Sequence, residues 1–174
     1  DMALLPGATP EAAGTANVAL APGEMSWIEA VRLERWSDAG PRIDALPEGN
    51  RARPEMRYVR ARAAIGAGDA ARALPLLSGL EAQLPLLADD VARWRAEAQL
   101  VAGPYAEAAA YFAKSTKSRD LSKAAVAYDK AGDAASSRRC ADLAVTTAAK
   151  SKSVRDEARA RMERARLLQA RHGN

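Results

Sequence analysis

The 174-residue chain has few aromatic side chains, and it holds a single cysteine, a single histidine and a single phenylalanine. One cysteine cannot form an internal disulfide or supply a thiolate cage for a metal. Cys140 is followed by small and apolar residues, so we expect a packed side chain, in either a reducing or an oxidising compartment. The chain also lacks an apolar run of about 18 residues, so the sequence predicts no membrane-spanning helix.

Residues that carry chemistry are equally scarce. The only histidine, His172, lies close to the end of the sequence, where a general base or metal ligand would lack supporting neighbours. The paired acids Asp89-Asp90 and Asp156-Glu157 stand at predicted helix starts, where the helix dipole explains them. The glycines at 66 and 68 lack the downstream Lys-Ser/Thr of a phosphate loop. We therefore predict no catalytic residue, no metal ligand and no cofactor, and we expect that this chain is not an enzyme.

Alanine is the commonest residue, whereas isoleucine and valine are few, a composition that favours helices over strands. The stretch 100–112 has the pattern of a helix end, a turn at Gly103-Pro104 and the start of a second helix. Similar helix starts, separated by 34, 35 and 29 residues, are found at Trp36, Ala70, Tyr105 and, most weakly, Ala134. A period near 34 in helix-turn-helix units is typical of tetratricopeptide-type repeats.

The repeat also has a packing logic. Small residues let the second helix of a hairpin approach the first, and a large residue one turn later fills the groove between them. The predicted packing residues are Trp36, Ala39, Ile43, Ala70, Ala73, Leu77, Tyr105, Ala108 and Phe112. One hairpin cannot bury this face alone, so neighbouring hairpins must stack.

We therefore expect an all-α fold over residues 24–174. The expected architecture is a tetratricopeptide-like α-solenoid of about four helical hairpins with a C-terminal capping helix. The Ala-, Pro- and Gly-rich segment 1–23 is expected to be a flexible leader. The alternative is an ordinary alanine-rich helical bundle in which the spacing is accidental.

Local signals predict where several helices begin and end. Ser26 is expected to cap a helix in a capping box with Glu29. The dipeptides Gly68-Asp69 and Gly132-Asp133 should each join two helices, because glycine can take the left-handed conformation and aspartate can cap the next helix. Either Asp89 or Asp90 is expected to cap a further helix.

Two other segments carry specific expectations. Pro75 and Gly79 conflict with a straight helix over 69–84, so we expect a kink or a late start there. The last segment, 153–171, is predicted to be a long amphipathic helix. Its predicted buried stripe consists of Val154, Ala158, Met162, Ala165 and Leu168.

Charge is unevenly distributed along the chain. Residues 1–50 hold three basic and eight acidic groups, residues 51–100 hold eight and six, and residues 101–174 hold fifteen and eight. A basic end of this kind could meet an anionic partner such as nucleic acid, lipid headgroups or a wall polymer. Solvated helix surfaces explain the same charges more simply. Because Tyr128 is the only aromatic residue between 114 and 174, a nucleic-acid partner is disfavoured.

Two Ala- and Arg-rich segments show a resemblance to a known family. They are residues 58–77, YVRARAAIGAGDAARALPLL, and residues 91–112, VARWRAEAQLVAGPYAEAAAYF. Over about residues 26–170 the chain resembles the helical superhelix that precedes the catalytic domain in bacterial soluble lytic murein transglycosylases. In that family the superhelix curves around a lysozyme-like domain and helps position it on peptidoglycan, which is cleaved without water to leave an anhydro-sugar end.

This resemblance implies a periplasmic or cell-envelope location, although a cytoplasmic one stays open, and a removed export signal before the leader. The catalytic glutamate of the family lies in a Glu-Ser motif, and this chain contains no Glu-Ser pair. No catalytic role can therefore be carried over to any residue here. The resemblance implies the non-catalytic, accessory part of an envelope enzyme.

Two functions follow as hypotheses. The first is a non-catalytic scaffold in the cell envelope, namely the accessory region of a lytic transglycosylase, with a following catalytic domain or peptidoglycan as partner. The alternative is a free-standing adaptor that binds a peptide or protein tail in its concave groove. The candidate groove residues lie on predicted first helices of the hairpins and are Arg57, Arg60, Arg93, Glu97 and Lys123.

Overall fold

A computed structural model describes residues 25–172, and within that range it contains eleven α-helices, one short 3-10 helix and no strand. The prediction of an all-α fold is therefore confirmed for this part of the chain. The predicted leader, residues 1–23, lies outside the described residues, as do residues 24, 173 and 174.

The elements of the first half are α1 (Trp27–Arg32), α2 (Trp36–Asp44), α3 (Glu48–Arg51), α4 (Pro54–Gly66), α5 (Ala70–Leu77), α6 (Leu80–Gln83) and the 3-10 helix η1 (Pro85–Leu87). Those of the second half are α7 (Ala88–Ala102), α8 (Tyr105–Phe112), α9 (Ser118–Lys130), α10 (Ala134–Lys150) and α11 (Val154–His172). Each of the four positions that define the sequence period is the first residue of a helix, namely of α2, α5, α8 and α10.

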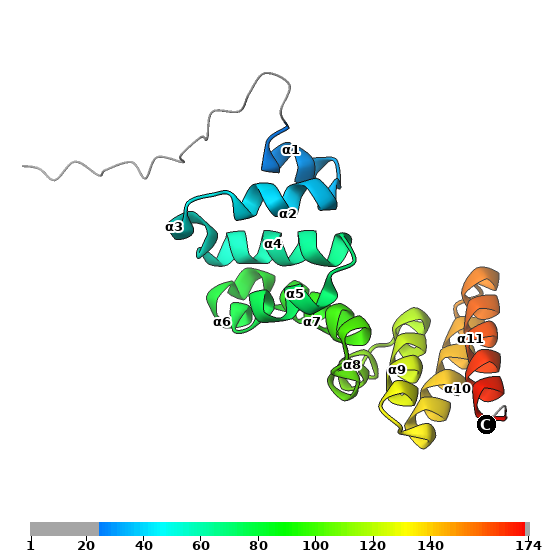
Figure 1. Ribbon diagram of the computed structural model, residues 1–174. Coiled ribbons are helices and arrows are strands. Elements are labelled where there is room, and N and C mark those ends of the chain that lie inside the picture. The colour runs from blue at the N-terminus through cyan, green and yellow to red at the C-terminus, as the bar shows by residue number, and fades with distance from the viewer. Residues whose placement is uncertain (1–24, 173–174) are drawn as a thin grey trace, which may run out of the picture.

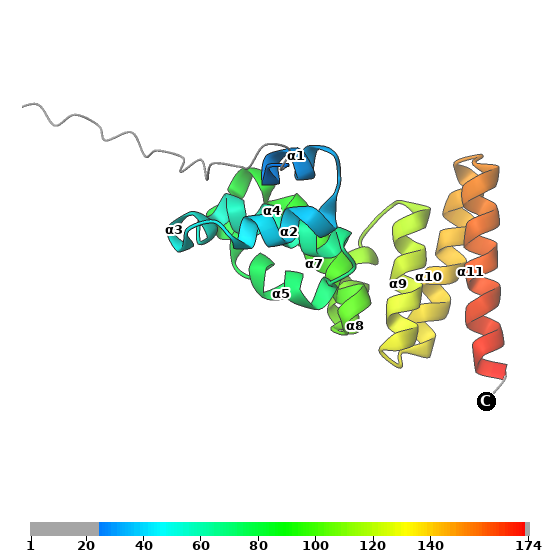
Figure 2. The ribbon, with the colours of Figure 1, turned by 45° about the horizontal axis from the view of Figure 1, so that its top comes forward.

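The longer helices pack in chain order and form an elongated array, in which α1 and α11 lie toward opposite ends (Figures 1 and 2). Helix α2 packs on α4, α4 on α5, α5 on α7, and α7 on α8. Further along, α8 packs on α9, α9 on α10, and α10 on α11, while α9 also contacts α11. Most of the packing therefore joins elements that are close neighbours in the sequence.

The buried apolar side chains of the described residues fall into separate clusters that follow the same order. One cluster includes Ala39 and joins α1, α2 and α4. The next surrounds Leu77 and joins α4 to α7, and a third surrounds Phe112 and joins α7 to α10. The last includes Ala148 and joins α9, α10 and α11. Alanine dominates all of these clusters, and its small side chain allows neighbouring helix axes to approach closely.

The nine predicted packing residues lie on α2, α5 and α8. Seven of them are buried, whereas Trp36 and Tyr105 are half-buried at the start of their helices. In the weakest copy of the repeat, Ala134 is exposed, whereas Ser137 and Ala141, the next positions of the same 3,4 spacing, are buried. Helices α2, α5 and α8 therefore bury most of the predicted packing residues.

The two Gly-Asp junctions have the predicted conformation. Gly68 and Gly132 have φ values of +85° and +83°, in the left-handed region that favours glycine. The side chain of Asp69 accepts a hydrogen bond from the backbone N–H of Arg72, and that of Asp133 accepts one from Ser136. These predictions are confirmed, and so is the cap at Ser26, whose side chain accepts from the N–H of Glu29.

One helix boundary differs from expectation, whereas the interruption expected in the segment 69–84 is present. The predicted aspartate cap of α7 is wrong, because Leu87 is the N-cap and makes no side-chain cap, while Asp89 and Asp90 lie inside the first turn. The 3-10 helix η1 runs directly into α7 and leaves no position for a capping side chain. Pro75 lies within α5, and the helix ends shortly after it, where Gly79 adopts a φ of +70° before α6 begins.

The predicted buried stripe of α11 is wrong. Val154 is 81% exposed and Met162 is 68% exposed, whereas Ala160 is 2% exposed. At 100° per residue, Ala160 lies on nearly the opposite side of the helix from the predicted stripe. Its small side chain lets α11 pack closely on α9 and α10, so Val154 and Met162 are left outside. Of the predicted stripe, only Leu168 is half-buried.

Candidate functional site

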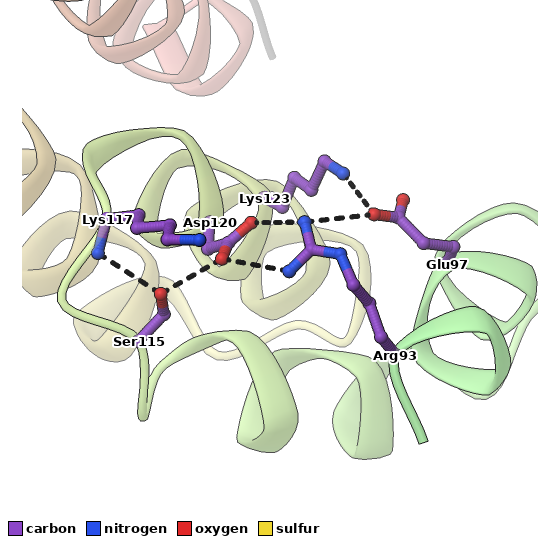
Figure 3. Close-up of polar contacts among 6 residues, drawn as sticks. All are labelled: Arg93, Glu97, Ser115, Lys117, Asp120 and Lys123. Atoms are coloured by element: carbon purple, nitrogen blue, oxygen red, sulfur yellow. Dashed lines mark hydrogen bonds and ion pairs between the residues drawn. The ribbon is translucent and has the colours of Figure 1, made fainter. Parts of the chain in front are cut away.

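The structure divides the predicted groove residues between two groups of contacts. Arg93 and Glu97 on α7 meet Lys123 on α9 in one polar cluster (Figure 3). Arg57 and Arg60 instead take part in contacts of α4 with α2 and α5. The five residues do not converge on a single point.

The cluster between α7 and α9 is built from side chains that share a face of each helix. Arg93 and Glu97 are four residues apart on α7, and Asp120 and Lys123 are three residues apart on α9, so each pair lies on one side of its helix. Helix α8 packs on both α7 and α9, and the two pairs of side chains point toward each other (Figure 3). Two cations and two carboxylates alternate across the contact.

Asp120 is the centre of this cluster. The two Nη atoms of Arg93 donate to its carboxylate at 3.2 and 2.9 Å. The hydroxyl of Ser115 donates to the same carboxylate at 2.9 Å, and the backbone N–H of Lys117 donates to that hydroxyl at 3.1 Å. Sequence reasoning missed Asp120 because its partner Arg93 lies 27 residues away, and no local pattern indicates such a contact.

Glu97 and Lys123 complete the cluster. The ammonium of Lys123 is hydrogen-bonded to the Glu97 carboxylate, and Arg93 lies 3.7 Å from the same carboxylate. The Lys123 ammonium also lies 5.2 Å from the ring centroid of Phe112, one of the predicted packing residues. The cluster therefore joins α7 and α9 through charge and contacts α8 through a ring.

Electrostatics keep the central pair ionised. Burial alone would raise the pKa of Asp120, but the hydrogen bonds from Arg93 and Ser115 outweigh it and hold that pKa below the usual carboxyl value. The same hydrogen bond raises the pKa of Arg93 above its usual value. A carboxyl group with a lowered pKa is a poor proton donor at neutral pH, so this pair is suited to holding helices together.

A second polar cluster surrounds Asp44 at the end of α2. Arg60 donates to both carboxylate oxygens, at 2.7 and 2.8 Å, and Arg72 donates to one of them at 2.9 Å. The hydrogen bond from Arg60 lowers the pKa of Asp44. Space for the guanidinium comes from Gly40, where an added Cβ would lie 2.9 Å from an Arg60 nitrogen. Asp44 thus connects α2, α4 and α5.

Arg57 has a different role in the same region. Its guanidinium donates to the backbone carbonyl of Ser78 at 3.0 Å, just beyond the last residue of α5. Carbonyl groups at a helix C-terminus lack partners within the helix, and a cation there is also favourable to the helix dipole. Arg57 therefore secures the end of α5 against α4.

A cation between two indole rings forms a further contact that sequence reasoning missed. The guanidinium carbon of Arg62 lies 3.7 Å from the ring centroid of Trp94 and 5.8 Å from that of Trp36. Such contacts are favourable because the face of the indole ring is electron-rich. Gly66 makes room for Trp36, since an added Cβ would lie 2.2 Å from a ring atom. This contact joins α2, α4 and α7.

A hollow of about 290 Å³ lies beside Lys123 and is bounded by α7, α9 and α11. Its apolar lining includes Leu100 and Val126, and its charged lining includes Arg119 and Arg159. The sequence singled out only Lys123 of this set. The other members could not be recognised before the three helices were placed together.

Within residues 25–172, no group of three or more His, Cys, Asp or Glu side chains is arranged to hold a metal ion. Of the helices in the same range, none combines the length and the apolar character needed to cross a bilayer.

Comparisons with protein-family models, with curated proteins and with solved structures give no match to this chain. The resemblance to lytic transglycosylases therefore depends on the sequence segments that suggested it.

Proposed function

We propose that this chain is a non-catalytic helical-repeat scaffold that holds a segment of another protein. In this proposal the helices form a tetratricopeptide-like solenoid in which hairpins stack on one another. The observation that carries it is the division of the buried residues into successive clusters, each shared by neighbouring helices. Arrays in which a repeat contacts only its neighbours expose long surfaces, which suit extended partners.

The polar contacts support the same proposal. Asp44 joins α2, α4 and α5, and the Arg93 and Asp120 pair joins α7 and α9. Arg164 and Asp142 form a further pair between α11 and α10. Each of these contacts fixes one helix relative to a neighbour. Charged groups at such junctions set the geometry of an array, which is a structural role and does not involve a substrate.

We propose the cell envelope as the location, on the sequence resemblance alone. In that setting the chain would be the accessory region of a lytic transglycosylase, with a following catalytic domain or peptidoglycan as partner. A reading frame that continues past residue 174 into a lysozyme-like domain with a Glu-Ser motif would support this form of the proposal. A frame without such a domain would remove it and leave the adaptor as the form that stands.

Incubation of the purified chain with peptidoglycan sacculi tests the scaffold proposal directly. We expect no soluble muropeptides, and sedimentation of the chain with the sacculi would favour the envelope role. Release of soluble muropeptides would show that the chain is catalytic and would overturn the proposal. Retention of a stoichiometric protein partner from envelope extract, with no binding to sacculi, would favour the adaptor.

A further inference from the structure

The hollow between α7, α9 and α11 has both charged and apolar lining residues. Arg119, Lys123 and Val126 are spaced four and three residues apart, so they form one stripe along α9. Arg159 contributes from α11, and Leu100 contributes from the last turns of α7. At about 290 Å³, the hollow is at the lower limit of ligand pockets, about 300 Å³. It has room for a side chain or two of a bound segment.

The basic residues at the hollow differ in how closely they pair with carboxylates of the same chain. Lys123 is paired with Glu97, as described above. Arg159 has its carboxylate neighbour Asp156 at 4.0 Å, which is the limit of an ion pair. Arg119 forms no ion pair with any residue in the described part of the chain. Two guanidinium groups at the hollow therefore keep donors available for a ligand from outside.

The carboxylate in the lining does not cancel this charge. Glu163 lies at the hollow, but it is 3.6 Å from Arg166, which offsets its charge. The excess of basic residues in 101–174, fifteen against eight acidic ones, also attracts an acidic partner over longer range. The guanidinium groups at the hollow and the net positive charge of residues 101–174 therefore both favour an anionic ligand.

We infer that this hollow binds an acidic segment of a partner protein, with a carboxylate against Arg119 and Arg159 and an apolar side chain against Leu100 and Val126. The inference rests on the proposed scaffold function and names the partner chemistry of that scaffold. Guanidinium groups bind carboxylates through paired hydrogen bonds. Among the described residues that line the hollow none is aromatic, so they offer no stacking surface for the bases of a single-stranded nucleic acid.

The test is a selection of random peptides on the immobilised full-length chain, followed by fluorescence polarisation with the selected peptides. The wild type is compared with the double variant R119E/R159E. The matched control is K114E/R155E, which makes the same change in net charge at two exposed residues outside the hollow. Circular dichroism confirms that all three proteins are folded.

We expect the wild type to select peptides that combine Asp or Glu with a large aliphatic residue. The double variant should bind these peptides at least about tenfold more weakly, which corresponds to about 1.4 kcal/mol, and the control should change affinity less than about twofold. Val126→Ser should weaken the preference for the aliphatic residue, because it replaces an apolar lining residue with a polar one.

Each other outcome overturns a distinct claim. Selected peptides without an acidic bias, or peptides that R119E/R159E binds as well as the wild type does, would refute the assignment of this hollow and leave the scaffold function intact. Failure to select any peptide would refute both the inference and the proposed binding of protein segments. Tighter binding of an oligothymidylate than of a peptide of equal charge would show that the ligand is nucleic acid.

Discussion

Replacing Asp120 with asparagine removes the charge that Arg93 and Ser115 contact between α7 and α9. The asparagine keeps the size of the side chain and one acceptor oxygen, so no cavity is created. Breaking a buried ion pair costs about 3–5 kcal/mol. The Asp120 side chain is 5% exposed, but that of Arg93 is 37% exposed, so water can replace part of the lost interaction. We expect a loss of about 2–3 kcal/mol in the free energy of unfolding.

Urea denaturation followed by far-ultraviolet circular dichroism measures this loss. For a chain of this size the corresponding decrease in melting temperature is about 4–12 °C. The matched control is Asp142→Asn, in which an aspartate that is 51% exposed loses its pair with Arg164, which is 47% exposed. Exposed pairs are worth less than about 1 kcal/mol. The reasoning is refuted if Asp120→Asn destabilises the chain no more than Asp142→Asn does.

A double-mutant cycle with Arg93→Met separates the pair from other effects of the substitution. If the two side chains stabilise each other, the double variant should be less destabilised than the sum of the single variants, by about 1–2 kcal/mol. Strict additivity would mean that the contact between the two side chains contributes nothing to stability.

Three further predictions concern packing and pH. Phe112→Ala should lower the free energy of unfolding by about 3–5 kcal/mol, because Phe112 is completely buried. Its control Leu86→Ala, at a residue that is 98% exposed, should change that free energy by less than about 0.5 kcal/mol. Equal urea midpoints for the two variants would contradict this prediction. Gly66→Ala should cost about 1–3 kcal/mol and shift tryptophan fluorescence, because its Cβ would meet the Trp36 ring; an unchanged spectrum and midpoint would show that the ring moves freely. The pKa of Asp120 is lower in the folded chain, so the stabilisation from its charge is present above the unfolded-state pKa and is lost as the pH falls through the folded-state pKa. The difference in urea midpoint between the wild type and Asp120→Asn should therefore narrow below about pH 4. A constant difference down to about pH 3 would argue against this charge effect.

Local sequence signals predicted the helix boundaries well where a single residue has a strong conformational preference. Glycine at Gly68 and Gly132 permits the left-handed turn, and the aspartate that follows each one caps the next helix. The predicted cap of α7 was wrong, because Asp89 and Asp90 follow the 3-10 helix η1 and belong to the first turn of α7. An aspartate in the first turn, which the helix dipole favours, and an aspartate at the N-cap cannot be told apart from the sequence alone.

Periodicity alone did not identify the buried face of α11. In a helix rich in alanine, more than one stripe of apolar residues satisfies the helical period. The predicted stripe contained the larger residues Val154 and Met162, but the structure buries Ala160 and exposes both of them. Close contact with α9 and α10 selects the smallest side chain, and this choice depends on neighbours that lie far away in the sequence.

The candidate site was predicted only in part for a related reason. Lys123 was recognised as a charged residue on a first helix, but neither Arg119 nor Arg159 was connected to it. These two arginines lie 40 residues apart and border one hollow because α11 returns beside α9. A sequence pattern within one helix does not show which other helix will lie beside it in the folded chain.

The sequence by itself determined that the described chain is helical and where most of its helices begin, because backbone preferences act over a few residues. The tertiary structure alone decided which charges pair and where a hollow forms. Arg93 and Asp120, 27 residues apart, gain their hydrogen bonds only when packing against α8 brings α7 and α9 together. Those bonds depend on distances that folding creates.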